Sequence, residues 1–380
     1  MDPSNPFGPS PKQKPSNQII IHIDMDCFYV SCERLRDPIL IDQPVIVGMN
    51  YTPGESRGAV ATASYEARDL GIKSAMNISK ALSILPDKEL NPSFEPSCYY
   101  RTADKNFYRE ISQSVRTILE DFSDVARHVS IDEAYLDVTS KTTWTSSSTF
   151  SQILRDEIES VVGVPSSIGV APSMSIAKMA SSIEKPKGIV VVKPEQTKEF
   201  LSNLPIEKLP GIGPVTAKSL HSDGIKLIGE LATIPPVDLK NKYGNKGISL
   251  SILSRGEDSK KVIPMGPKKS ISRESSFKHI TTNSDEKKAL IEKLSQDVGS
   301  IATSNNALFR TVGIKVIEPP YKIHTREISF GTATNDPNLI STSAMDLLKD
   351  FHEISVRKMG VKVSNLSFHG VEQTKINQWD

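Results

Sequence analysis

The chain has 380 residues, of which 37% are hydrophobic and 24% charged, and its formal net charge is +1 at pH 7. This length is too great for one compact core and predicts about two to four domains. No apolar run approaches the roughly 20 residues that span a membrane, so we expect no membrane partner. The three cysteines show no metal-ligand spacing and indicate a reduced, cytoplasmic setting, or a nuclear one in a eukaryotic source.

Charge is distributed unevenly along the chain. Residues 186–273 carry 15 Lys and Arg against 8 Asp and Glu, a net charge of +7. Residues 98–185 carry 9 against 12, a net charge of −3. A basic region beside an acidic one is typical of a DNA grip next to a metal site. An unevenly charged, solvated surface is the plainer alternative, and charge alone favours neither.

The first predicted elements lead to an acidic residue. Residues 1–16 hold five prolines and no apolar block, which predicts a disordered lead rather than a signal peptide. Residues 19–24 are nearly all apolar and end in Asp24, which predicts a buried central strand. The elements expected next are a helix at 27–35, strands at 45–47 and 58–62, and a helix that is capped by Ser64 and stops at Gly71.

Two groups of carboxylates, far apart in the sequence, are the first candidates for chemistry. Asp24 ends the predicted strand, and Asp132 and Glu133 occupy the turn of a hairpin expected from strands at 125–131 and 134–138. Mg²⁺ prefers oxygen ligands, and two such ions can stabilise both the attacking and the leaving oxygens of an in-line displacement. Because neighbours on a regular strand face opposite sides, Asp132 and Glu133 can share a metal only where the chain bends.

Plainer roles exist for these acidic residues. A lone Asp-Glu pair in a hairpin usually serves the turn itself. Asp26 lies beside a helix start, so we expect it to cap that helix rather than to bind a metal.

A second candidate site lies on the helix that follows Ser64. Tyr65 and Arg68 are three residues apart, so their hydroxyl and guanidinium groups project together. The forked Arg side chain suits phosphate oxygens. A Thr/Ser-rich loop is expected at 141–149 and a helix at 173–185. Lys178 lies on this helix and could add a third donor. A packed Tyr, a surface Arg and a solvated Lys are the alternatives.

The third candidate is a glycine hairpin. Gly211 and Gly213 lie in the sequence Pro-Gly-Ile-Gly-Pro and lead into a helix that begins at Pro214 and carries Lys218. Free N–H groups at a helix start bind anions, and glycines let another backbone approach closely. This helix-hairpin-helix pattern indicates contact with a phosphate backbone without base recognition, whereas a simple connection between two helices is the alternative.

The C-terminal region forms a separate unit in the sequence. A basic linker at 257–269, which includes Lys268 and Lys269, precedes it. The elements expected after the linker are a strand at 271–279, a helix with Leu290, Leu294, Val298 and Ile301 on one stripe, strands at 310–317 and 321–330, a helix at 339–355 and a strand at 361–369. This β-α-β-β-α-β order predicts a small α+β domain.

Taken together, these motifs resemble one known family. The segments that carry the resemblance, in family order, are 24–29, 61–68, 130–137, 185–188 and 210–213. The chain is similar to Y-family DNA polymerases of the DinB branch, related to polymerase IV and polymerase kappa, and an archaeal source is expected. The resemblance covers about residues 17–370, and several separated motifs in one order are more specific than any alone.

The resemblance implies an α+β multidomain fold, a right-hand polymerase with palm, fingers and thumb and a C-terminal βαββαβ little finger. The implied domains are a palm at 17–29 and 98–185, fingers at 30–97, a thumb at 186–256 and a little finger at 270–370. The implied activity is template-directed addition of dNTPs to a primer 3′ end, with low fidelity, in translesion synthesis. A monomer that binds primer-template DNA is expected.

The resemblance also implies roles for individual residues. Two Mg²⁺ ions would be held by the carboxylates of Asp24, Asp132 and Glu133 and by the Met25 carbonyl. Tyr29 would be the steric gate beneath the sugar, backed by Phe28. The triphosphate would be held by Thr62, Tyr65, Arg68 and Lys178. Gly58 and Ala59 would lie over the templating base pair and leave room for misshapen bases, unless they only ease strand packing.

The last residues, 371–380, predict a clamp-binding tail. Gln373, Ile376 and Trp379 recur every three residues, so one turn of 3₁₀-like helix would align them on one face. This arrangement resembles the peptide that docks polymerases on a sliding clamp of the proliferating-cell-nuclear-antigen type, although it has one aromatic residue where two are common. A frayed tail whose Trp folds back on the domain is the alternative.

Two rival functions share some of these features. A nucleotidyl cyclase also uses two metals on a strand and a hairpin, but it has no need of a helix-hairpin-helix or a basic linker. A catalytically silent DNA-binding scaffold has no need of the three carboxylates.

Overall fold

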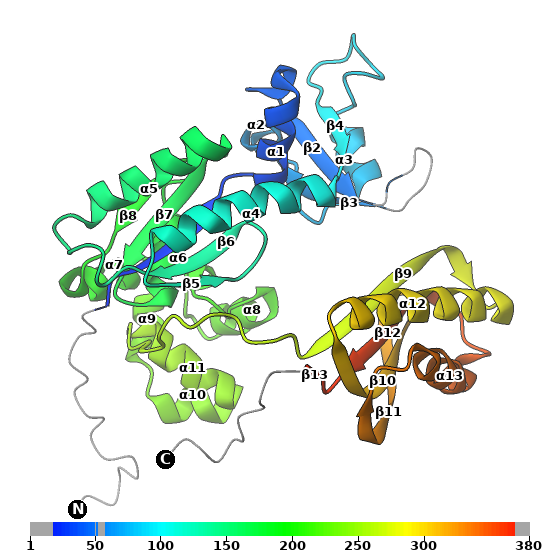
Figure 1. Cartoon of the computed structure of the whole chain (residues 1–380). Coiled ribbons are helices and arrows are strands. Elements are labelled where there is room, and N and C mark those ends of the chain that lie inside the picture. The colour runs from blue at the N-terminus through cyan, green and yellow to red at the C-terminus, as the bar shows by residue number, and fades with distance from the viewer. Residues whose placement is uncertain (1–17, 50, 52–57, 369–380) are drawn as a thin grey trace, which may run out of the picture. The chain divides into compact units, whose positions relative to one another are not determined.

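The computed structural model describes residues 18–49, 51 and 58–368. The chain divides into two compact units between Met265 and Gly266 (Figure 1). The lead and the tail expected from the sequence lie outside the described residues. Within the described part, no helix combines the length and the apolar character needed to cross a membrane.

The first unit is organised around a five-stranded sheet whose central strand is β1 (Ile20–Met25). This strand is antiparallel to β6 on one side and to β7 on the other. It is buried over nearly its whole length, as expected for a central strand of apolar residues. In spatial order the sheet consists of β5 (Val125–His128), β6 (Glu133–Asp137), β1, β7 (Ser166–Ala171) and β8 (Ile189–Val191).

Helices cover both faces of this sheet. Helices α4 (Lys105–Asp121) and α5 (Ser147–Val162) bury one face, with Ile21 and Ile168 in the same core. Helix α6 (Met174–Ser181) packs on β1 and β7 from the other side. Its approach is so close that a Cβ on Gly169 would lie 2.1 Å from the Ala177 carbonyl oxygen, so only glycine fits there.

A smaller sheet with strand order β3-β2-β4 forms the next part of the unit. Strand β4 belongs to this sheet, although residues from 98 onward are assigned to the palm by sequence. Strand β8 likewise joins the large sheet, although residues from 186 onward are assigned to the thumb. The elements of this part are α1 (Phe28–Arg36), a 3₁₀ turn (Pro38–Leu40), β2 (Val45–Met49), β3 (Ala59–Ala63), α2 (Tyr65–Asp69), α3 (Ile78–Ile84) and β4 (Tyr99–Thr102).

Short helices make up the remainder of the first unit, as the frequent Gly and Pro residues predict. They share a core with α6 and with Ile20 of β1. The elements are two 3₁₀ turns (Pro194–Gln196 and Ile206–Lys208) and helices α7 (Thr197–Ser202), α8 (Pro214–Ser222), α9 (Ile228–Thr233), α10 (Pro236–Tyr243) and α11 (Asn245–Ser254).

The second unit has the β-α-β-β-α-β order expected from the sequence. Its four long strands form one antiparallel sheet in the order β11-β10-β12-β9, with two helices packed on one face. The elements are β9 (Ser270–Thr281), α12 (Ser284–Ser304), β10 (Ala307–Glu318), β11 (Lys322–Thr334), α13 (Pro337–Leu348), a 3₁₀ turn (Lys349–Phe351), β12 (Val356–Ser364) and β13 (Ser367–Phe368).

Several predicted element limits are wrong. The last strand, predicted at 361–369, is displaced, because β12 covers Val356–Ser364 and β13 only Ser367–Phe368. Strand β5 ends at His128 rather than at residue 131. Helix α5 begins at Ser147, inside the predicted loop, because Leu154 and Ile158 bury a helical face that propensity alone does not reveal. Helix α6 ends at Ser181 rather than at residue 185. Helix α13 ends at Leu348, because its last predicted residues form a 3₁₀ turn and an irregular segment.

Candidate active site

The backbone brings the predicted carboxylates together. Asp24 on β1 and Glu133 on β6 are directly opposite each other in the antiparallel pair, so both side chains leave the same face of the sheet. The Met25 N–H donates a hydrogen bond to the Asp132 carbonyl (2.9 Å), which joins the turn to the central strand. The side chains of Asp24 and Glu133 remain 28% and 17% exposed, so solutes can reach them.

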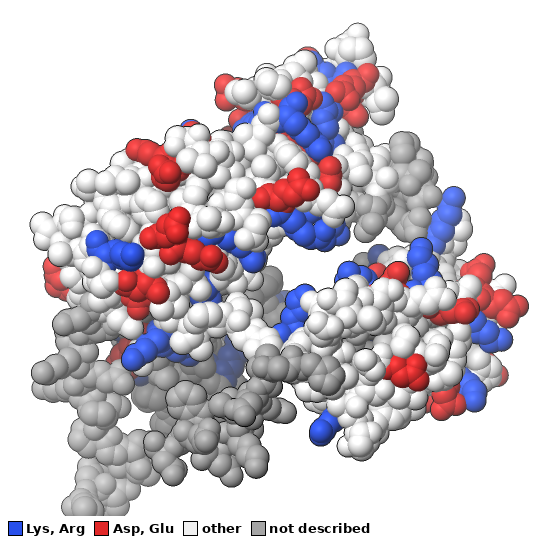
Figure 2. All heavy atoms as spheres, in the orientation of Figure 1, with Lys and Arg blue, Asp and Glu red and all other residues white. Residues whose placement is uncertain are grey.

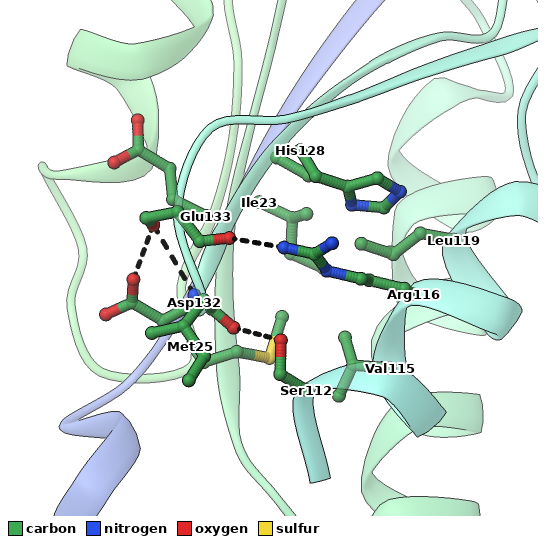
Figure 3. A pocket seen from close by; sticks show the side chains of 12 residues that line it. Ile23, Met25, Ser112, Val115, Arg116, Leu119, His128, Asp132 and Glu133 are labelled. Atoms are coloured by element: carbon green, nitrogen blue, oxygen red, sulfur yellow. Dashed lines mark hydrogen bonds between the residues drawn. The ribbon is translucent and has the colours of Figure 1, made fainter. Parts of the chain in front are cut away.

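The turn between β5 and β6 supplies the bend that the sequence requires. Figure 3 shows the side chains of Asp132 and Glu133 leaving the turn on the same side, away from Arg116 and Ser112. Ser130 Oγ donates a hydrogen bond to Asp132 Oδ1 (2.6 Å) and helps to set the direction of that carboxylate.

Helix α4 holds this turn from behind. Ser112 Oγ donates to the Ile131 carbonyl (2.6 Å), and Arg116 Nη2 donates to the Ser130 carbonyl (3.2 Å) (Figure 3). Both residues lie on one face of α4, four positions apart, and they line a small cavity of about 10 Å³ behind the turn. Neither residue is predicted from the sequence, because nothing in the sequence pairs this helix with the turn.

His22 and Lys178 surround the Glu133 carboxylate. His22 is 1% exposed, and its Nε2 donates a hydrogen bond to Glu133 Oε1 (2.8 Å) while Ser181 Oγ lies 2.7 Å from its Nδ1. The Lys178 ammonium contacts the same carboxylate oxygen. The hydrogen bond from His22, together with Lys178, outweighs burial and lowers the pKa of Glu133 to about 2. Glu133 is therefore an anion at neutral pH.

A second lysine contacts Asp24. The Lys185 ammonium pairs with Asp24 Oδ1 and lies 3.7 Å from Asp26 Oδ1. Burial raises the pKa of Asp24 from its ordinary value, although Lys185 opposes the rise. Lys185 lies in the segment 185–188, which carries part of the family resemblance, but no role for its side chain is predicted from the sequence.

The donor set suits a hard divalent cation. Asp24, Asp132 and Glu133 offer only carboxylate oxygens, the ligand type that Mg²⁺ prefers. Among the described residues, however, no three His, Cys, Asp or Glu side chains already lie in the arrangement of a complete metal site. That result agrees with lysines contacting two of the carboxylates. Mg²⁺ in proteins is usually held by one or two carboxylates and takes its remaining ligands from phosphates and water.

Asp26 does not cap a helix, so that expectation is wrong. Helix α1 begins at Phe28 after Cys27, whereas the Asp26 side chain points into the protein and is 1% exposed. It accepts hydrogen bonds from Ser167 Oγ (2.9 Å to each oxygen), Lys187 N (2.8 Å) and the Tyr65 hydroxyl (3.0 Å). Asp26 thus ties three separate segments together beside Asp24.

Two of the predicted phosphate-binding residues lie together. The Arg68 guanidinium lies 4.9 Å from the centre of the Tyr65 ring and donates from Nε to the Ala63 carbonyl (3.0 Å). Thr62 lies on β3, directly before the helix that carries them. Lys178 lies on α6 with its ammonium at Glu133, so it joins the carboxylates rather than this pair.

The predicted sugar-contacting residue lies in an aromatic stack. The Tyr29 ring lies 4.4 Å from the Tyr108 ring, with 20° between the planes, and 6.0 Å from the Phe28 ring. Phe28 is buried, while Tyr29 is only partly buried and can meet a ligand. No role for Tyr108 is predicted from the sequence.

The small residue Gly58 has a local explanation. Its φ of +107° belongs to a backbone conformation that favours glycine, and an added Cβ would lie 2.9 Å from Ile78 Cδ1. The backbone directly before β3 therefore requires glycine at this position, independently of any effect on base selection.

The glycine hairpin has the expected shape. Gly211 has φ +94°, and Gly213 is the cap before Pro214 at the first position of α8. A Cβ at Gly211 or Gly213 would meet no atom within 4 Å, so another backbone can approach both positions. Lys218 is exposed on the same helix.

Basic residues outside this hairpin occur in two settings. Lys268 and Lys269 are exposed in the irregular segment before β9. On the sheet of the second unit, by contrast, Glu274 pairs with Lys315 (3.1 Å) and with Lys358 (2.6 Å). Figure 2 shows basic and acidic side chains interspersed over the visible face of this unit.

Comparisons with known proteins cover nearly the whole chain. The sequence matches the impB/mucB/samB family over residues 23–182 and the C-terminal domain of the same family over residues 268–376. The helix-hairpin-helix motif of this family matches residues 194–225.

Similar proteins include two archaeal enzymes. A DNA polymerase IV of Halobacterium salinarum is 46% identical over 359 residues, which cover 94% of this chain and 87% of that protein. A DNA polymerase IV of Methanoculleus marisnigri is 34% identical over 364 residues, which cover 96% of this chain and 98% of that protein.

Solved structures with a similar fold include two Y-family enzymes. A Y-family DNA polymerase chimera of Dbh and Dpo4 matches with a TM-score of 0.82 and 27% identity, covering 92% of this chain and 99% of the other. An insertion ternary complex of Dbh DNA polymerase matches with a TM-score of 0.67 and 26% identity over the same shares.

Proposed function

This chain belongs to the impB/mucB/samB family, the Y-family DNA polymerases, and from this premise we propose that Asp24, Asp132 and Glu133 catalyse primer extension through two Mg²⁺ ions. The protein is a DNA-directed DNA polymerase of the translesion and repair class. The observation that supports the catalytic assignment is the direct pairing of Asp24 with Glu133 across β1 and β6, with Asp132 in the adjoining turn.

The metal ions would lower the barrier by stabilising the attacking primer oxygen and the leaving pyrophosphate oxygens. The three carboxylates and the Met25 carbonyl would hold them. The buried His22 keeps Glu133 oriented toward the site through a partly buried hydrogen bond. Hydrogen bonds to the residues that bind a metal ion commonly fix the orientation of those residues.

Lys178 and Lys185 have a part in substrate binding. Each now pairs with a carboxylate that is assigned to a metal. When nucleotide and metal bind together, each lysine ammonium would leave its carboxylate and pair with a phosphate oxygen instead. The metal ions would then neutralise the carboxylates, and the lysines would neutralise part of the phosphate charge. This exchange agrees with the assignment of Lys178 to the triphosphate, together with Thr62, Tyr65 and Arg68.

The remaining parts of the proposal concern sugar, DNA and partners. Tyr29 would be the steric gate that excludes a 2′-hydroxyl. Gly211, Gly213 and Lys218 would contact the DNA backbone, helped by Lys268 and Lys269. We also propose that the enzyme has low fidelity, is a monomer and is located in the cytoplasm. It would dock on a sliding clamp through Gln373, Ile376 and Trp379.

Primer extension on a defined template tests the proposed function. Reactions with and without Mg²⁺, in the presence of all four dNTPs, should give template-directed products only with the metal. Formation of a cyclic nucleotide instead of a longer primer would contradict the proposal, as would extension that persists in a chelator.

A further inference from the structure

We propose that Glu33 is a positioning residue for sugar discrimination, because it holds the Tyr108 ring against which Tyr29 stacks. The inference rests on the proposed function, since it takes Tyr29 as the steric gate. Glu33 does not touch a substrate. It acts through Tyr108.

Glu33 is a buried carboxylate with an unusually complete set of partners. It lies on α1 and is 1% exposed. The Tyr108 hydroxyl donates to Glu33 Oε1 (2.5 Å), and Arg36 donates to Oε1 from Nη2 (2.8 Å) and to Oε2 from Nε (3.0 Å). Burial of a carboxylate is costly unless such partners hold it, so its position is tightly defined.

Tyr108 carries this geometry to the predicted gate. It lies on α4 and is fully buried, so its ring cannot turn toward solvent. With its hydroxyl held by Glu33, the ring presents one face to Tyr29 at 4.4 Å and 20°. Offset stacking depends on orientation, so the plane of Tyr29 follows the plane of Tyr108.

Arg36 holds Glu33 from the other side. Its guanidinium lies 4.7 Å from the centre of the Phe107 ring, and Nη1 donates to Asp104 Oδ2 (3.1 Å). Asp104 in turn caps α4 by accepting from the Phe107 N–H (3.2 Å). Helices α1 and α4 are therefore joined at the point where each contributes one ring to the stack.

Helix joining alone does not account for this arrangement. An apolar pair would join two helices at least as well, because a buried ion pair is often no more stable than well-packed hydrophobic residues. What the hydrogen bond adds is a fixed direction for the Tyr108 ring. A selective site needs such definition, because a gate that tilts away from the sugar would admit a 2′-hydroxyl.

The test compares dNTP and rNTP use in variants of the full chain. Tyr108→Phe removes the hydroxyl but keeps the ring, and Glu33 retains Arg36. Glu33→Met removes the acceptor, whereas Glu33→Gln retains an oxygen that can accept from Tyr108. The measured quantity is the ratio of kcat/KM for a dNTP to that for the matching rNTP.

We expect Tyr108→Phe and Glu33→Met to lower this ratio about three- to tenfold, which corresponds to about 0.7–1.4 kcal/mol. Glu33→Gln should keep most of the wild-type ratio. In the double variant that combines Tyr108→Phe with Glu33→Met, this ratio should be little lower than in Tyr108→Phe alone, because the two changes remove the same hydrogen bond.

A matched control is the ion pair between Arg34 of α1 and Glu66 of α2. Arg34 Nη2 donates to Glu66 Oε1 (3.2 Å) and Oε2 (3.1 Å), so Glu66→Gln also weakens a carboxylate–guanidinium pair, but one that involves neither Tyr29 nor Tyr108. Its ratio should equal that of the wild type even if its efficiency changes.

The outcomes separate this inference from the proposed function. If Tyr29→Ala lowers the ratio while Tyr108→Phe and Glu33→Met leave it unchanged, the role of Glu33 is refuted and the gate stands. If Tyr29→Ala also leaves the ratio unchanged, the gate assignment itself is wrong. Tyr108→Phe keeps the test decisive if Glu33→Met fails to fold.

Discussion

The hydroxyl of Tyr65 donates a hydrogen bond to the buried carboxylate of Asp26, 3.0 Å away. The two residues belong to different parts of the first unit, since Asp26 follows the central strand of the large sheet and Tyr65 begins α2 beside the smaller one. Because Ser167 and the Lys187 N–H also donate to Asp26, one carboxylate connects the predicted fingers to the floor of the predicted active site.

Asp26→Ala should therefore reduce the free energy of unfolding by about 2–4 kcal/mol, because several buried donors lose their acceptor. Urea denaturation monitored by circular dichroism measures the change. Tyr65→Phe is the matched control, since it removes one of these hydrogen bonds and should cost only about 1 kcal/mol. Equal urea midpoints of unfolding for Asp26→Ala and the wild type would show that the hydrogen bonds to Asp26 do not stabilise the fold.

The double variant Asp132→Ala with Glu133→Ala should lose nucleotide transfer while keeping its fold. Both side chains are partly exposed at a turn whose backbone is held by Ser112 and Arg116, so neither anchors the core. Primer extension in Mg²⁺ measures activity, and circular dichroism with DNA-binding assays serves as the control. Extension at the wild-type rate would refute the metal assignment.

Tyr29→Ala should admit ribonucleotides. The ring is expected to occupy the space that a 2′-hydroxyl needs, so its removal abolishes a repulsive contact that rejects the wrong substrate. The ratio of dNTP to rNTP efficiency should fall on the order of 100-fold, which corresponds to about 2.7 kcal/mol. An unchanged ratio would move attention to Phe28, whose ring lies 6.0 Å away.

Reversing the charge of Lys268 and Lys269 should weaken DNA binding and its salt dependence. Each lysine that neutralises a phosphate contributes about 0.9 to the slope of log affinity against log salt, so the slope should shrink by about 2. Lys288→Glu with Lys293→Glu, on exposed positions of α12, makes the same change in net charge and is the matched control. A slope equal in both double variants would place the phosphate contacts elsewhere.

Removal of residues 373–380, which lie outside the described residues, should abolish binding to a sliding clamp. Trp379→Ala should have nearly the same effect, since a Trp is a frequent anchor of protein interfaces. Short distributive synthesis should be unchanged, while clamp-stimulated extension is lost, because tethering only raises the effective concentration at the primer end. Calorimetry that finds equal clamp affinity for the full and shortened chains would refute the docking peptide.

Much of the fold followed from local patterns. The apolar run before Asp24 predicted the central strand, and the alternation of strands and helices after residue 270 predicted the βαββαβ unit. The first and last residues of helices and strands were less predictable where tertiary packing determines them. Helix α5 starts inside a Thr/Ser-rich stretch, because burial of Leu154 and Ile158 outweighs the weak propensity of those residues for a helix.

The sequence by itself determined which chemical groups are present and the turns that display them. Asp24, Asp132 and Glu133 could be named because hard oxygen ligands at a strand end and in a hairpin suggest a metal site. Gly211 could be named because glycines before a helix start let another backbone approach closely. Only the tertiary structure decided the partners of these groups. His22 at Glu133, Asp26 at Tyr65 and Glu33 at Tyr108 are contacts between residues 39 to 111 positions apart. Such contacts depend on how helices and strands pack, and local sequence does not specify that packing.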